Sequence, residues 1–134
     1  MKPVRVLYVE DDPISREVME MFCNFGLEGV ELTMFADSAD FIQKLEALPS
    51  HSDIILLDIH VKPIDGFEML RLIRQHSDFK DIKVLALTAS VMNEEVDLLK
   101  QVGFDGGIAK PIDAVDFQDV FYRVIRGERI WHIA

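Results

Sequence analysis

Cysteine is nearly absent from this 134-residue chain, which contains only Cys23. A single cysteine cannot form an internal disulfide, so the composition fits a reducing compartment such as the cytoplasm. Cys23 has no histidine beside it, and the histidines at positions 51, 60, 76 and 132 show no metal-ligand spacing with it or with one another. We expect Cys23 to lie away from the apolar face of its helix and to be chemically inert.

Long apolar runs and basic residues are also scarce. The sequence contains no stretch of about 18 apolar residues, which is the length needed to span a bilayer, and its N-terminus lacks the apolar segment of a signal peptide. No membrane partner is therefore expected. Lys and Arg number 14 against 24 Asp and Glu, and the formal net charge of −10 would repel the phosphates of nucleic acid. The apolar fraction of 49% indicates one folded domain with a substantial core.

Short apolar runs alternate with amphipathic segments along the whole chain. Five strands are predicted, at Val4–Val9, Val30–Phe35, 54–58, Ile82–Leu87 and, weakly, Gly107–Ala109. A helix follows each strand, and the five helices begin near Pro13, Asp37 or Ser38, Gly66, Asn93 and Asp113. This alternation predicts an α/β fold, a doubly wound five-stranded parallel sheet in a three-layer α/β/α domain. In the first helix we expect an inward face of Ile14, Val18, Met21, Phe22 and Phe25.

The segment Asp53-Ile-Ile-Leu-Leu-Asp58 is the stretch around which this fold is organised. Four consecutive apolar residues indicate a strand buried on both faces, and such a strand accommodates a carboxylate only where it leaves the sheet. Asp58 stands at that carboxyl end, where open α/β sheets bind ligands. Taken alone, Asp58 is equally well explained as a cap of the following turn.

Other polar residues are predicted to meet Asp58 at the same sheet edge. Glu10 and Asp11 follow the first strand, Thr88 ends the fourth, and Lys110 follows the fifth. Clustered carboxylates repel one another unless a cation lies among them, and oxygen ligands with room for phosphate are what Mg²⁺ prefers. The group is therefore equipped for phosphoryl transfer to Asp58, although each taken alone is better explained otherwise, Thr88 as an ordinary threonine at a strand end and Lys110 as a solvated base.

These segments resemble the receiver domain of bacterial response regulators in two-component signalling. The resemblance rests on Val-Leu-Tyr-Val-Glu10-Asp11-Asp12, Ile-Ile-Leu-Leu-Asp58, Asp65-Gly66, Leu-Ala-Leu-Thr88-Ala89 and Ile-Ala-Lys110-Pro111, and it spans residues 4 to about 125. It implies a strand order of 2-1-3-4-5. It also divides the chain into a receiver domain at 1–126 and a C-terminal tail at 127–134.

The resemblance assigns a role to each site residue. Asp58 would take a phosphoryl group from a phosphohistidine, with Mg²⁺ held by Glu10, Asp11, Asp58 and the backbone carbonyl of His60. Thr88 would hydrogen-bond one phosphoryl oxygen and Lys110 would neutralise another. The side chain of His60 is expected to face solvent, and Lys110–Pro111 is expected to be cis.

Two positions depart from the family pattern. The residue three before the lysine is usually aromatic, but here it is Gly107, which follows Gly106. We expect this pair to leave a hollow that accepts a partner's apolar side chain, with output carried by the loop at 88–93. The proline that usually stands fourth after the acceptor is replaced by Lys62, and Pro63 follows it.

A phosphorylation switch is the favoured function, with a histidine kinase or phosphotransfer protein as donor and a downstream protein as target. Unless it is a fragment of a larger regulator, the chain is expected to be a single domain without a DNA-binding output. It is also expected to show only self-phosphorylation and autodephosphorylation chemistry and to be compatible with a homodimer. The rival is a small Mg²⁺-dependent phosphohydrolase with an aspartyl nucleophile. That enzyme would need an acid shortly after Asp58, where Ile59 and His60 stand. The tail carries Trp131 between two isoleucines, so we expect it to dock on its own domain or, less favoured, on a partner subunit.

Overall fold

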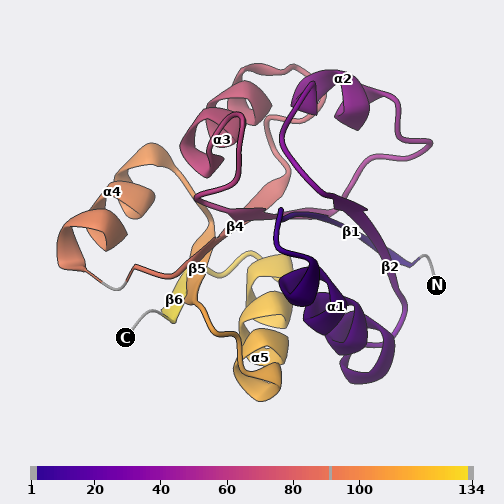
Figure 1. Cartoon of the computed structure of the whole chain (residues 1–134), viewed down its shortest axis with the longest axis vertical. Coiled ribbons are helices and arrows are strands. Elements are labelled where there is room, and N and C mark those ends of the chain that lie inside the picture. The colour runs from indigo at the N-terminus through magenta and orange to yellow at the C-terminus, as the bar shows by residue number, and fades with distance from the viewer. Residues whose placement is uncertain (1–2, 91, 133–134) are drawn as a thin grey trace.

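The computed structural model describes residues 3–90 and 92–132 and consists of a parallel sheet covered by helices on both faces (Figure 1). The strands are β1 (Val4–Val9), β2 (Val30–Phe35), β3 (Ile54–Asp58), β4 (Lys83–Thr88), β5 (Gly106–Ala109) and β6 (Ile130–His132). The helices are α1 (Pro13–Met21), α2 (Phe41–Glu46), α3 (Gly66–Gln75), α4 (Asn93–Val102) and α5 (Ala114–Ile125), with a π-helical turn at Phe22–Gly26. The strand order is β2-β1-β3-β4-β5-β6. The expected α/β/α fold and its 2-1-3-4-5 order are confirmed, with six strands rather than five.

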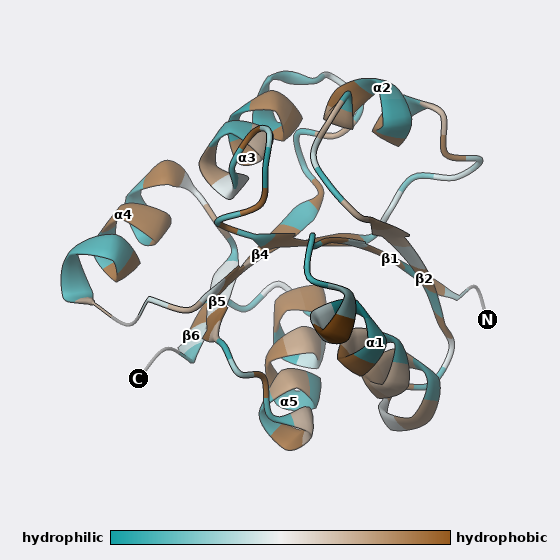
Figure 2. Ribbon diagram, in the orientation of Figure 1, coloured by the Kyte–Doolittle hydropathy of each residue, from teal (hydrophilic) through white to brown (hydrophobic). Residues whose placement is uncertain are grey.

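Strand β3 lies at the centre because its side chains are buried on both faces. Ile55 and Leu57 belong to the core beneath α2, α3 and α4, whereas Ile54 and Leu56 belong to the core beneath α1 and α5. Each fully buried side chain of this size stabilises the fold by about 1.5–3 kcal/mol. Figure 2 shows the hydrophobic central strands between the two helical layers. No helix in the described ranges is long and apolar enough to cross a membrane.

Helix α1 buries a different face from the one that the sequence predicts. Met19 and Cys23 are buried in the core, and the expected inward residues Ile14, Met21 and Phe25 are exposed by 69%, 59% and 87%. The expectation that Cys23 lies off the buried face is wrong, and burial raises the pKa of its thiol to about 11. Helix α1 therefore presents an apolar stripe of Ile14, Val18 and Met21 to solvent, and Phe25 in the following π-helical turn is exposed as well.

The C-terminal segment forms β6 and extends the sheet, which confirms that it docks on its own domain. Strand β6 pairs in parallel with β5, and Trp131 lies opposite Gly107. Trp131 packs against the core beneath α4, with the Nζ of Lys100 5.7 Å from the centre of its ring. The expectation of an open hollow beside Gly107 is wrong, because the chain's own tail covers it. Gly106 makes this close approach possible, since a Cβ there would lie 2.8 Å from the backbone oxygen of Ile130.

Replacing Gly106 with alanine is expected to dislodge β6. Trp131 is the only tryptophan, so its emission reports on the tail: it should be blue-shifted in the parent protein and move toward that of free tryptophan in G106A. The control is G26A, because a Cβ at Gly26 would meet no atom within 4 Å. Unchanged emission in G106A would contradict the close packing of β6 on β5.

Candidate functional site

The carboxyl ends of β1, β3, β4 and β5 meet at one edge of the sheet. Glu10 and Asp11 follow β1 directly, Asp58 ends β3 and Thr88 ends β4. Glu10, Asp58 and Thr88 are buried, whereas Asp11 is exposed. The structure therefore brings together acids that lie about 50 residues apart in the sequence, because parallel strands place their carboxyl ends side by side.

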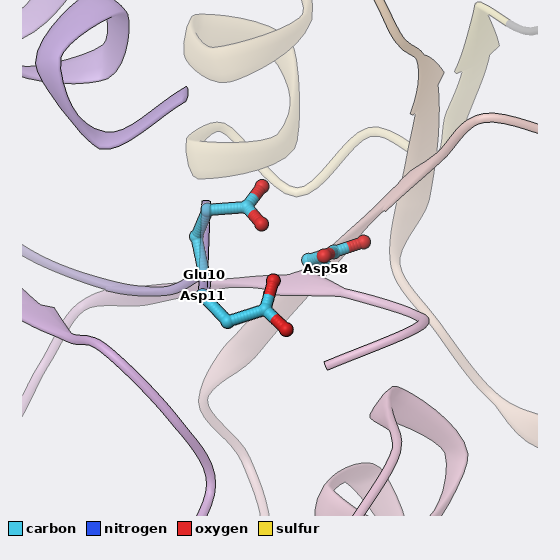
Figure 3. Close-up of side chains that lie close together, drawn as sticks. All are labelled: Glu10, Asp11 and Asp58. Carbon is cyan, nitrogen blue, oxygen red and sulfur yellow. The ribbon is translucent and has the colours of Figure 1, made fainter. Parts of the chain in front are cut away.

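Three carboxylates form the floor of this site. One oxygen from each of Glu10, Asp11 and Asp58 lies within 4.8 Å of an oxygen from each of the other two. Figure 3 shows Glu10 and Asp11 extending from the end of β1 toward Asp58. A set of oxygen ligands with two buried members and one exposed member fits Mg²⁺, which keeps some of its water when proteins bind it.

Lys110 supplies a positive charge at the same place. Its Nζ is 2.6 Å from Oε1 of Glu10 and 3.8 Å from Oδ1 of Asp58. The hydroxyl of Tyr8 donates a second hydrogen bond to Oε1 of Glu10, at 2.8 Å. The Lys110–Pro111 peptide bond is cis, as expected, and the Lys62–Pro63 bond is cis as well. Lys110 thus joins the ends of β1 and β5 through a buried carboxylate.

The two buried carboxyl groups titrate in opposite directions. Burial and the neighbouring Glu10 raise the pKa of Asp58 to about 6, although Lys110 and the amide of His60 partly oppose the shift. Burial would also raise the pKa of Glu10, but hydrogen bonds from Lys110 and Tyr8 outweigh it and lower that pKa. Glu10 therefore holds the ammonium, and Asp58 is the carboxyl group that a further cation would stabilise.

Thr88 and His60 border Asp58 and share a neighbour that the sequence analysis missed. The hydroxyl of Thr88 accepts a hydrogen bond from the amide of Ser90 at 3.0 Å and donates one to Oε1 of Glu95 at 3.3 Å. The amide of His60 donates to Oδ1 of Asp58 at 3.3 Å. The imidazole of His60 is 64% exposed, and its Nε2 lies 3.8 Å from the same oxygen of Glu95. In the sequence, Glu95 is indistinguishable from any acid that stabilises the first turn of a helix.

An apolar groove runs from this site along α1. It has a volume of about 270 Å³ and lies between the helix residues Ile14 and Val18 and the loop residues Lys110, Pro111 and Ile112. The groove thus joins the exposed stripe of α1 to the lysine that contacts Asp58.

The model of the response regulator receiver domain matches residues 6–121. The chain belongs to this family. The chain is 29% identical over 121 residues to the response regulator Rre1 of Synechocystis, and the aligned region covers 89% of this chain and 50% of Rre1. It is 27% identical over 111 residues to the osmosensing histidine protein kinase SLN1 of Saccharomyces cerevisiae, covering 81% of this chain and 9% of that kinase. The chain thus spans half or less of these relatives' lengths.

The fold of the receiver domain is also similar to a solved structure. The receiver domain of the sensor histidine kinase PA1611 from Pseudomonas aeruginosa superposes with a TM-score of 0.80 at 27% identity, covering 92% of this chain and 98% of that one. In the PA1611 structure a magnesium ion is coordinated in the active-site cleft. This chain is accordingly a receiver domain of two-component signalling.

Replacing Asp58 with asparagine is expected to stabilise the metal-free receiver domain at neutral pH. The native state holds the pKa of Asp58 at about 6, above its ordinary 3.8, so the native state binds this proton more tightly than the unfolded chain does. Stability is therefore lost as the pH rises from about 4 to about 6, and at about 1.36 kcal/mol per unit the loss at pH 7 is at most about 3 kcal/mol.

Urea unfolding in the presence of a chelator measures this difference. The gain in the free energy of unfolding for D58N should be present at pH 7 and absent at pH 4. The control is D119N, which removes an exposed carboxylate from α5. An equal gain at the two pH values would show that the effect is not one of ionisation.

Proposed function

We propose that the chain is a phosphorylation switch in which Asp58 is the phosphoacceptor. One oxygen of the Asp58 carboxylate attacks the phosphorus of a phosphohistidine, a new O–P bond forms, the N–P bond breaks, and the imidazole leaves with the bonding electron pair. The observation that carries the proposal is the convergence of Asp58 with two further carboxylates and one ammonium at a buried sheet edge.

The neighbouring groups have separate tasks in this proposal. Glu10, Asp11, Asp58 and the backbone carbonyl of His60 would hold Mg²⁺, which, when bound, supplies positive charge against the carboxylates and the phosphoryl oxygens. Lys110 is 3.8 Å from Asp58 and orients the attacking carboxylate before neutralising a phosphoryl oxygen. Thr88 stabilises the acyl phosphate through its hydroxyl.

The chain's own residues favour a switch over the rival phosphohydrolase. Hydrolysis with turnover needs a general acid beside the nucleophile, and the two residues after Asp58 are the buried Ile59 and the outward-facing His60. We therefore propose that the chemistry is limited to phosphorylation and dephosphorylation of Asp58. The readout is a change in protein binding, in keeping with a net charge of −10 that disfavours nucleic acid.

Acetyl phosphate with Mg²⁺ is expected to add one phosphate to the parent protein, measured by intact-mass spectrometry. D58N should abolish the addition, and removing Mg²⁺ with a chelator should prevent it. D119N, with a distant exposed carboxylate removed, should react like the parent. Phosphate recovered on Ser90 or His60 instead of Asp58 would disprove the assignment of the acceptor.

The exposed stripe of α1 is proposed as the docking surface for a histidine kinase or phosphotransfer protein. A protein donor must bring its phosphohistidine to Asp58, and the groove between α1 and Pro111 opens beside Lys110. Ile14 and Val18 line this groove and are exposed by 69% and 36%, which is unusual for large apolar side chains. Covering them would give the donor binding energy next to the reacting atoms.

The double variant I14A/V18A is expected to slow phosphorylation by a protein donor but not by a small-molecule donor. Phosphorylation by a histidine-phosphorylated phosphotransfer protein should slow by about thirtyfold, since each of the two truncations removes on the order of 1 kcal/mol of apolar contact. Phosphorylation by acetyl phosphate should be unchanged. The matched control M92A/L98A truncates exposed apolar residues at α4 instead. Equal slowing with both donors would place the defect in the site rather than in docking.

A further inference from the structure

Glu95 links the site to the first turn of α4. Its Oε1 accepts a hydrogen bond from the hydroxyl of Thr88 at 3.3 Å and lies 3.8 Å from Nε2 of His60. Thr88 is completely buried, and the side chain of Glu95 is only 26% exposed. One carboxylate from α4 thus lies close to the last residue of β4 and to a residue of the loop that follows β3.

A threonine hydroxyl has only one proton to donate. In this structure the proton is given to Glu95, while the oxygen accepts from the amide of Ser90. Thr88 can therefore donate to a phosphoryl oxygen on Asp58 only after its hydrogen bond to Glu95 has broken. The two acceptors, one on α4 and one on Asp58, compete for the same donor.

We propose that Glu95 is a positioning residue that holds the Thr88 hydroxyl away from Asp58 until phosphorylation, and that exchange of this hydrogen bond releases the first turn of α4. The inference rests on the proposed function of Asp58. A phosphoryl group carries a charge of about −1.5 to −2, so it attracts the Thr88 proton and repels the Glu95 carboxylate. Both effects drive the exchange in the same direction.

The start of α4 is suited to respond. Glu95 is the third residue of the helix, and the amides of Glu95 and Val96 both donate to the carbonyl of Met92. The cap residue Met92 gives no side-chain hydrogen bond to this end of the helix. Breaking the contact with Thr88 therefore removes a hydrogen bond between α4 and β4, and the side chain of the cap residue Met92 provides none in its place.

The test uses beryllium fluoride with Mg²⁺ as a stand-in for the phosphoryl group, with binding followed by amide NMR. E95A is expected to bind it about fivefold more tightly than the parent, because Thr88 no longer has to leave an ionised acceptor. E95Q, which keeps a weaker neutral acceptor, should lie between the two. The matched control E94Q removes the charge of the neighbouring acid and should bind like the parent.

A double-mutant cycle separates this role from a merely structural one. In a T88A background, E95A should no longer tighten binding, because no hydroxyl remains to be released. Persistence of the fivefold gain in T88A, or parent-like binding by E95A, would overturn the inference while leaving the acceptor assignment intact. Absence of any response in the parent protein would overturn the proposed function and this inference with it.

Discussion

The site depends on an unequal balance of charge at one edge of the sheet. Glu10, Asp11 and Asp58 meet there, and the ammonium of Lys110 lies within 4 Å of only two of them. Lys110 contacts Glu10 more closely than Asp58, so its opposing effect on Asp58 is incomplete, and burial together with the neighbouring Glu10 keeps the pKa of Asp58 raised. The sheet can hold this arrangement because the strands behind it are buried on both faces, so the cost of gathering like charges is offset by apolar burial elsewhere. A further cation would reduce the excess of negative charge at this edge, whereas a phosphoryl group would increase it.

Most of the fold and the central residues of the site could be predicted from the sequence. The 54–58 run is apolar on both faces, and only a strand covered by helices on both sides explains it. Once parallel strands are assumed, Glu10, Asp11, Asp58, Thr88 and Lys110 must share an edge. The face of α1 was not predictable in the same way, because its apolar residues cover two faces. The periodicity favoured Ile14, Val18 and Met21, whereas packing selected Met19 and Cys23.

The missed features depend on contacts between distant elements. Strand β6 has only three residues, and its pairing needs the absence of a side chain at Gly106, whereas the sequence led us to expect a hollow beside the glycine pair. Glu95 carries no local signal, since an acid in the first turn of a helix is stabilising wherever that helix lies. Only the positions of Thr88 and His60 around it distinguish Glu95 from other acids.

The tail and the glycine pair also restrict where a conformational signal can leave the domain. Ala86, Gly107 and Trp131 lie in one row across β4, β5 and β6, so the two small residues stand beside the large one. A bulky side chain at Gly107 would compete with Trp131 for the space beneath α4, where Trp131 already packs against the core. The edge of β5 is therefore closed by the chain itself. The first turn of α4 is joined to the site through the hydrogen bond between Thr88 and Glu95, and it is this turn, rather than β5 or β6, that we propose carries the signal.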